Sequence, residues 1–292
     1  MIDKIEIRGV LPEDKEAVLR FCQQTWEWGD YIGQAWDAWL SDPCGRLVVG
    51  IFENLPVAVA HLTMLAPGEA WLEGLRVAPD YRNRGVGELV GQHCVRAATE
   101  MGAIVIRFMT LASNMAACRI AARLGFRQVA SFLPYWADSE KGSSQLLTTL
   151  EPEHLEDLLA FIEGSDIYRS VSGLYCTGWA YHKLTEEKLR RHLERGDVLT
   201  LEQGELLRAL AVVTTSPLDQ GIVVGYVDGQ MEAMGELALA LKAVAGKTGH
   251  PRVEARLPDL SQVCGAFSRA GYTPYFDEPF PVFQLSPGTK DT

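Results

Sequence analysis

The stretch that decides the fold is WLEGLRVAPDYRNRGVGELV, which runs from Trp71 to Val90. It opens with alternating apolar residues, which are typical of a strand, and it closes on the start of a helix. Between them lies a turn that contains Gly85 and Gly87 and is preceded by two arginines. Glycines let a backbone approach a ligand closely, and the free amides at a helix start favour an anion. The stretch therefore predicts a phosphate-binding strand–loop–helix unit.

Two common phosphate loops do not fit this stretch. A P-loop ends in Gly-Lys-Ser/Thr, and that ending is missing here. The dinucleotide motif needs a third glycine, whereas only Gly85 and Gly87 fit and the arginines come first. A surface turn that binds nothing is the alternative interpretation at this point.

The segments around the loop alternate between strand and helix patterns. Strands are expected over 4–10, 46–52, 57–65, 70–77 and 103–109. Helices are expected from Pro12 to Cys22, over 88–101 with Gly102 as a C-terminal cap, and from the N-cap Ser113 to Arg123. This order predicts a mixed α/β arrangement in layers.

The second half of the chain repeats the first with small shifts in spacing. Residues 207–215 resemble 56–64, and residues 221–228 resemble 70–78. Cys264 precedes Gly271 by the same spacing that separates Cys118 from Gly125. A repeat this long indicates a duplicated domain, and chance similarity between two α/β domains is the alternative. We expect one domain over 1–140 and a second over 141–292.

Composition excludes several classes of function. The net charge of −11 disfavours nucleic acids and anionic membranes as partners. The six cysteines form no C-x-x-C pair and have no histidine at metal-ligand spacing, so we expect no metal site and a reducing compartment. The start of the sequence lacks the apolar core of a signal peptide, and no apolar run approaches about 18 residues. These features predict a cytoplasmic protein with no membrane association.

The loop and the segment after it resemble the GNAT acetyltransferase superfamily. Motif A of that family reads Arg/Gln-x-x-Gly-x-Gly/Ala, and here Arg82, Gly85 and Gly87 match it. A second family motif matches Asn114, Ala117 and Gly125-Phe126. The resemblance covers about 1–140 closely and the remainder weakly, as a second copy. It implies tandem GNAT-like domains of the α/β (α+β) class, each a mixed, mostly antiparallel sheet flanked by helices.

The resemblance also implies acetyl-CoA as cosubstrate, with no metal. Amides from Arg84 to Glu88 would hold the pyrophosphate, and the strand near Leu75 would pair with the pantetheine arm. An amide there would stabilise the oxyanion that forms when the acceptor amine attacks the thioester directly. The residues expected to bind the cosubstrate are Leu75, Arg76, Val77, Arg82, Asn83, Arg84, Gly85, Val86, Gly87, Glu88 and Asn114.

Catalysis by this family needs a base, because free amines are protonated at neutral pH. Glu73 is the candidate, and strand alternation places it on the same face as Leu75 and Val77. A merely solvated or hydrogen-bonded strand glutamate is the alternative. His61 is a second candidate on the neighbouring strand. Many family members have a tyrosine acid where this chain has Ala121, so Tyr135 or a water would have to replace it.

The acceptor pocket is expected in the aromatic segment after the first helix. An aromatic wall beside a carboxylate suits a cationic amine, so the expected substrate residues are Trp28, Asp30, Tyr31 and His61. The sequence thus predicts an N-acetyltransferase that acts on a primary amine of a small molecule or amino acid. The alternatives are a protein or peptide N-acetyltransferase and a non-catalytic coenzyme A-binding sensor or scaffold.

The second copy carries a changed loop. It reads QMEAMG over 230–235, with Ala233 in place of a glycine and Glu232 where a phosphate would lie. We therefore expect this domain to be a degenerate copy that holds coenzyme A poorly.

Overall fold

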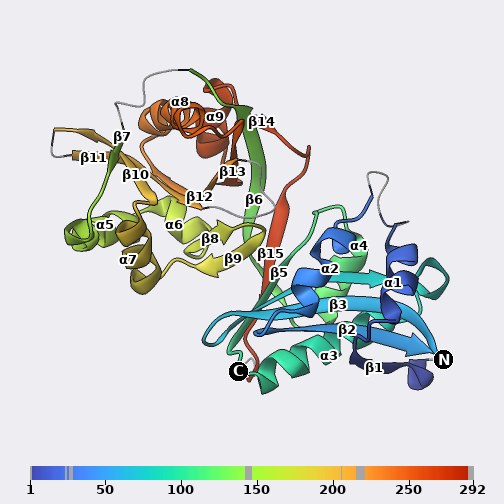
Figure 1. The fold of residues 1–292 in the computed structure, drawn as a ribbon. Helices are drawn as coiled ribbons and strands as arrows, with labels where there is room; N and C mark the ends of the chain where they lie inside the picture. The colour runs from blue at the N-terminus through green and yellow to red at the C-terminus, as the bar shows by residue number, and fades with distance from the viewer. Residues whose placement is uncertain are drawn as a thin grey trace. The chain divides into compact units, whose positions relative to one another are not determined.

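The computed structural model describes residues 2–23, 25, 29–141, 147–204, 206–214 and 221–288. Its contacts divide the chain into two compact units (Figure 1). The first unit comprises Met1–Thr110, Asn114–Arg127 and Phe283–Thr292, and the second comprises Leu111–Ser113 and Gln128–Val282. Among the described helices, none is both long enough and apolar enough to cross a membrane.

The first unit is built on a mixed sheet. The strand order is β1 (Glu6–Gly9), β2 (Gly45–Phe52), β3 (Leu55–Ala66), β4 (Glu69–Val77), β5 (Val105–Met109) and β15 (Phe280–Leu285), of which the part from Phe283 on belongs to this unit. The pairs from β1 to β4 are antiparallel, whereas β4 and β5 are parallel. The β4–β5 pairing covers only Glu69 to Trp71 on β4. Beyond Trp71, no further residue of β4 is paired with β5 among the described residues.

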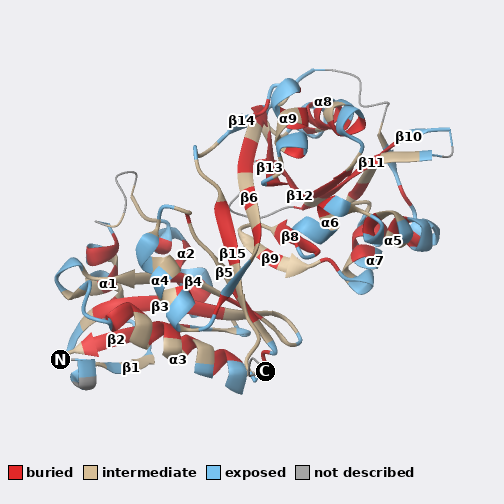
Figure 2. Ribbon diagram, turned by 180° about the vertical axis from the view of Figure 1, so that it is seen from behind, coloured by how far each residue is buried: buried red, intermediate tan, exposed pale blue. Residues whose placement is uncertain are grey.

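Helices cover both faces of this sheet. On one face lie α1 (Asp14–Cys22) and α2 (Ile32–Leu40), whose buried side chains pack on Leu47, Val49 and Val59. On the other face lie α3 (Val86–Glu100) and, packed against it, α4 (Met115–Arg123). The core under α3 contains Ala58, Ala60 and Leu62. Figure 2 shows the buried strands in red between partly exposed helices. Successive side chains of β3 thus point to opposite faces of the sheet, and both faces are covered by helices.

The second unit repeats this layout. Its strand order is β7 (Leu147–Thr149), β10 (Val198–Gln203), β11 (Leu206–Thr214), β12 (Ile222–Gly229), β13 (Arg252–Pro258) and β6 (Arg127–Asp138). The β12–β13 pair is parallel, and the other neighbouring pairs are antiparallel. Short β14 (Thr273–Pro274) also pairs with β6. The helices are α5 (Leu155–Glu163), α6 (Asp166–Ser170), α7 (Glu186–Arg195), α8 (Met231–Thr248) and α9 (Ser261–Arg269), and the hairpin is β8 (Leu174–Thr177) and β9 (Ala180–Lys183).

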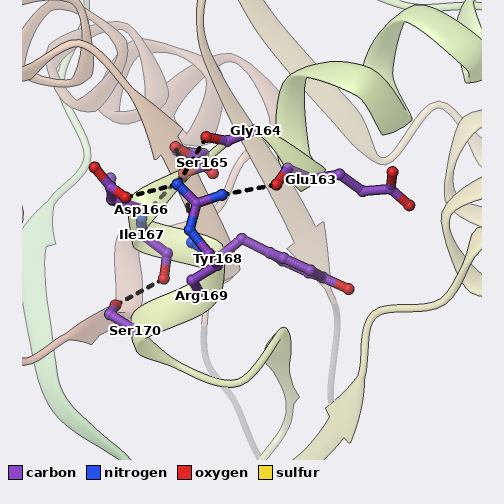
Figure 3. A network of polar contacts seen from close by, with 9 residues as sticks. Glu163, Gly164, Ser165, Asp166, Ile167, Tyr168, Arg169 and Ser170 are labelled. Atoms are coloured by element: carbon purple, nitrogen blue, oxygen red, sulfur yellow. Dashed lines mark hydrogen bonds and ion pairs between the residues drawn. The ribbon is translucent and has the colours of Figure 1, made fainter.

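A polar network fixes the junction between α5 and α6. The Arg169 guanidinium donates to the carbonyls of Glu163 and Gly164 at the end of α5, and it also binds the Asp166 carboxylate (Figure 3). Ser165 caps α6 by accepting the amides of Ile167 and Tyr168. Because the last carbonyls of a helix lack partners within it, this arginine supplies the missing donors.

The two units exchange one strand. In the first half of the chain, the strand that follows α4 is β6, and it pairs with β13 of the second unit. The first unit instead takes β15 beside β5, and Phe283 and Leu285 pack against its core. The Phe283 ring stacks on Phe108 at 5.2 Å between centroids. The last strand of each sheet thus comes from the other half of the sequence.

Most expected elements form close to the expected residues, with one change at a helix start. Asn114, not Ser113, is the N-cap of α4, and its side-chain oxygen accepts the amide of Ala117 at 3.2 Å. Ser113 instead donates its hydroxyl to Glu278 at 2.6 Å. The expected domain boundary between residues 140 and 141 stays a prediction. It describes the sequence repeat, whereas each compact unit of the structure combines segments from both halves of the chain.

Candidate functional site

A β-bulge in β4 organises the candidate site. His61 pairs with Glu73 and Val59 pairs with Arg76, so β4 carries one extra residue between these two pairs. Gly74 lies within the bulge at a φ of +66°, a conformation that side chains disfavour. A β-carbon on Gly74 would lie 2.5 Å from the Trp39 ring, so only glycine fits beneath α2.

The bulge corrects the expected orientation of Glu73. Strand alternation predicted Glu73 on the same face as Leu75 and Val77. Those two side chains pack on the core under α3, whereas Glu73 lies opposite His61, which stacks on Trp39 of α2. One inserted residue reverses the side on which every later side chain lies. Glu73 and the strand edge next to α3 are therefore reached from opposite faces of the sheet.

The loop from Pro79 to Gly85 leads from β4 into α3. Asn83 and Gly85 adopt positive φ values of 58° and 81°, and this tight path brings the helix start back toward the end of the strand. The first amide of α3 with a backbone acceptor is that of Leu89, which donates to the Gly85 carbonyl at 3.0 Å. Within the described chain, the amides of Val86, Gly87 and Glu88 have no such acceptor. These amides lie where the sequence predicts an anion cradle, and their role in binding stays a prediction.

Several expected cofactor residues have structural partners around this loop. The Arg82 Nε donates to the Val77 carbonyl at 3.0 Å, and the Arg84 guanidinium lies over the Tyr81 ring. Glu88 binds Arg123 of α4 at 2.8 Å. A β-carbon on Gly87 would lie 3.0 Å from Ile120, so this glycine also sets how closely α3 and α4 pack.

Glu73 belongs to a buried polar cluster on the α2 face. The His61 Nδ1 lies 3.0 Å from Glu73 Oε1, and the His61 Nε2 lies 3.6 Å from Asp42 Oδ2. The His61 imidazole stacks on Trp39, with 4.8 Å between centroids and 11° between planes. The two carboxylates are about three-quarters buried, and the imidazole is almost fully so. Glu73 is therefore a carboxylate with a fixed orientation and a small exposed fraction.

A second ion pair lies beside this cluster. The Arg76 Nε donates to Asp30 Oδ2 at 2.7 Å, and Asp30 also accepts the Ile32 amide at the start of α2. Tyr31 packs edge-on against Trp39, and the Arg76 guanidinium lies over its ring. Although 42% of Tyr31 is exposed, its hydroxyl end is withdrawn from water. That desolvation, together with the charge of Glu73, raises the pKa of Tyr31.

The expected acceptor residues thus have different surroundings. The Asp30 carboxylate is 3% exposed and is held by Arg76, so its charge is already compensated. His61 and Tyr31 lie on the Glu73 face, whereas Trp28 lies outside the described residues. Sequence reasoning missed Trp39 and Asp42 as members of this cluster. The sequence Asp42-Pro43 indicates a turn before β2, but no sequence pattern indicates that this turn lies beside His61.

The position of the missing tyrosine acid is closed. Ala121 is 1% exposed, in the core shared by α3 and α4. Tyr135, considered as a substitute, belongs to the core of the second unit, where burial raises its pKa and Ser268 and Cys264 lie beside its hydroxyl. Asn114 contributes as the cap of α4, with its amide donating to Thr110.

The second unit has the same bulge with different chemistry. Val213 pairs with Val224 and Val212 with Tyr226, so the extra residue is Gly225. A β-carbon there would lie 2.1 Å from the Cys176 carbonyl of β8, so the hairpin covers this stretch of β12. Near the end of β12 lies Asp228, a carboxylate that accepts from the Ser165 hydroxyl and the Gly229 amide. A carboxylate at this point opposes a phosphate electrostatically.

A cavity of about 350 Å³ lies in the first unit and shares Trp39 and Gly45 with the surroundings of His61. Its lining also includes Arg46 and His93 but not Glu73. Among the described residues, no group of three or more His, Cys, Asp or Glu side chains is placed to hold a metal ion.

Comparison with known proteins identifies the family of the first unit. The sequence model of the acetyltransferase (GNAT) family matches residues 15–126, which contain β2 to β5 together with the loop before α3. No curated protein sequence matches the chain.

Solved structures share the fold over nearly the whole chain. A GCN5-related N-acetyltransferase from Sphaerobacter thermophilus is 16% identical over 99% of this chain and 98% of its own, with a TM-score of 0.63. A putative acetyltransferase from Thermoplasma acidophilum is 15% identical over 96% and 99%, with a TM-score of 0.61. A tandem GNAT protein from the clavulanic acid biosynthesis pathway is 14% identical over 99% and 100%, with a TM-score of 0.56. Identities this low show the fold alone, and that fold includes the tandem arrangement. The chain therefore carries a domain of the acetyltransferase (GNAT) family, located by its family match at residues 15–126.

Proposed function

We propose that the first unit is an acetyl-CoA-dependent N-acetyltransferase that acts on a primary amine of a small molecule or amino acid. The observation that carries this proposal is the continuous path from the bulge of β4, through the glycine loop, to the unpaired amides of α3. In this proposal, the first amides of α3 and the unpaired edge of β4 bind coenzyme A on the α3 face of the sheet. The Glu73 carboxylate lies on the α2 face. In the second unit, a carboxylate and a hairpin stand at the equivalent places, and a carboxylate there opposes a phosphate.

The residues present fit a bound coenzyme A. Amides at Val86, Gly87 and Glu88 would hold its pyrophosphate, with the helix dipole and the Arg82 and Arg84 charges adding to the attraction. The backbone of β4 beyond Trp71, which β5 leaves unpaired, would bind the pantetheine arm by strand addition. When bound, acetyl-CoA supplies an acetyl thioester to this site.

Glu73 would serve as the base. An acceptor ammonium has a pKa of about 8 to 10, so it must lose a proton before it can attack. Glu73 lies at the bulge, next to the unpaired edge of β4, and its carboxylate retains partial access to solvent. The acceptor side is aromatic, with Tyr31 and Trp39 near Glu73, and such a surface suits a cation. Asp30 would act on the acceptor directly only if its pair with Arg76 opened.

One observation favours a second candidate function. Because Ala121 is a buried methyl group where many family members place an acid, the chain could bind coenzyme A as a sensor without turnover. A thiol has an ordinary pKa of about 8.5, so coenzyme A can leave as a thiolate without an acid. The absence of the tyrosine therefore weakens the protonation step but does not affect binding of the cosubstrate. A peptide or protein acceptor is the alternative within the transferase class.

The proposal is tested by binding and by thiol release. Acetyl-CoA binding is measured by calorimetry in the wild-type chain, in Arg82→Glu and in the equivalent second-unit variant Gln230→Glu. We expect binding to be lost only in Arg82→Glu, and equal losses in both variants would refute the assignment to the first unit. Release of free thiol from acetyl-CoA is then followed with a panel of amino acids, polyamines and peptides. Tight binding with no thiol release from any amine would favour the sensor.

A further inference from the structure

The His61 imidazole lies between two carboxylates. Its Nδ1 is 3.0 Å from Glu73 Oε1 on β4, and its Nε2 is 3.6 Å from Asp42 Oδ2 in the turn before β2. The side chain is only 2% exposed, so neither nitrogen has bulk water as its partner. Asp42 is fixed in place, because its other oxygen accepts the Cys44 amide at 2.8 Å.

The number of protons on the His61 imidazole decides how many of the two carboxylates it can donate to. A neutral imidazole has one N–H and can donate to one carboxylate only, whereas an imidazolium donates from both nitrogens. With Nδ1–H directed at Glu73, the buried Nε2 has no hydrogen-bond partner among the described residues. A lone pair there would face the negative Asp42, whereas a second N–H would face it favourably. The geometry therefore favours the doubly protonated ring.

The surroundings hold the ring in this position. Trp39 covers one face of the imidazole by stacking. Gly45 leaves room for the Asp42 contact, since a β-carbon there would lie 2.4 Å from Asp42 Oδ2 and 2.7 Å from His61 Nε2. Other charged or titratable groups on this face include Tyr31, the Cys22 thiol and the mutually paired Arg76 and Asp30. Their charges largely cancel, so the field at His61 is set by its two carboxylates.

We propose that His61 is a positioning residue, an imidazolium clamped by Asp42 that orients Glu73 and keeps it ionised as the base of the transfer reaction. The proposal rests on the proposed function for its chemical meaning. With Oε1 held by His61, Glu73 presents Oε2 to the acceptor. The neighbouring cation opposes protonation of Glu73 in the resting state.

The protonation state can be read without any ligand. The ring nitrogens of the full-length chain are observed by ¹⁵N NMR at pH 7.5, with His61 assigned from the spectrum of His61→Gln. We expect both nitrogens of His61 to carry protons in the wild-type chain and one proton to be lost in Asp42→Asn. Gly45→Ala should have the same effect, because its β-carbon would separate Asp42 from the His61 ring without changing any titratable group. Gly50→Ala on the same strand is the matched control, since its β-carbon would meet nothing closer than 3.4 Å.

Two results would overturn the proposal at this stage. One is a singly protonated His61 in the wild-type chain at pH 7.5, and the other is a doubly protonated ring that persists in Asp42→Asn. Failure of the wild-type chain to bind acetyl-CoA would refute the proposed function alone, since the ring is observed without ligand.

The kinetic consequence distinguishes positioning from a purely structural role. Gln at position 61 keeps one N–H donor but no charge, so Glu73 should protonate more readily in His61→Gln. The acid limb of kcat/KM should move to higher pH, with the KM for acetyl-CoA unchanged. A rate that falls by the same factor at every pH would contradict the proposal.

Discussion

Replacement of Gly74 by alanine tests the bulge on which the site depends. Gly74 has a φ of +66°, and a β-carbon in this region costs about 1–2 kcal/mol. The same β-carbon would lie 2.5 and 2.8 Å from two atoms of the Trp39 ring. Trp39 is 8% exposed and stacked on His61, so it cannot move aside freely, and such overpacking costs about 1–3 kcal/mol. We expect Gly74→Ala to lower the free energy of unfolding by about 2–5 kcal/mol.

The assay is urea unfolding followed by tryptophan fluorescence, because most tryptophans lie in residues 1–110. Gly68→Ala is the matched control. Gly68 has a φ of +79° in the β3–β4 turn, but its β-carbon would meet only the side chain of Ile104, which is 70% exposed. The control should therefore lose only the backbone cost of about 1–2 kcal/mol. Equal losses in the two variants would refute the argument that Trp39 confines the bulge.

Three further outcomes follow from burial and pairing. Phe283→Ala should destabilise the first unit by about 3 kcal/mol in the same urea assay, because the ring stacks on Phe108 in that core; an unchanged midpoint would contradict the strand exchange. Burial raises the pKa of Cys94 to about 12, so a thiol reagent at pH 8 should label exposed Cys44 long before Cys94; similar labelling rates, resolved by mass spectrometry, would show that this core opens readily. Burial also raises the pKa of Asp228, so its contribution to stability is present at low pH and is lost as the pH rises through the folded pKa. Asp228→Asn should therefore gain stability relative to the wild-type chain between pH 4 and pH 8, and an opposite trend in urea midpoints would refute this.

Local sequence signals were sufficient for the elements and for the conformation of the loop before α3. The positive φ of Gly85 and the unpaired amides after it follow from residues within a single stretch, so the loop could be predicted from its glycines. The strands from β2 to β5 formed within two residues of the expected bounds, because their apolar runs are separated by clear turns such as Pro67-Gly68. The repeat of the strand order in the second half was likewise visible from spacing alone.

Features that depend on tertiary contacts could not be predicted. Strand alternation put Glu73 on the face of Leu75, and the bulge at Gly74 reversed this. A single glycine in a strand signals a bulge only weakly. Asp42 approaches His61 because β2 and β3 are paired, and no periodicity reports that contact. The exchange of β6 and β15 was hidden for a similar reason, since each strand has the same pattern in either sheet.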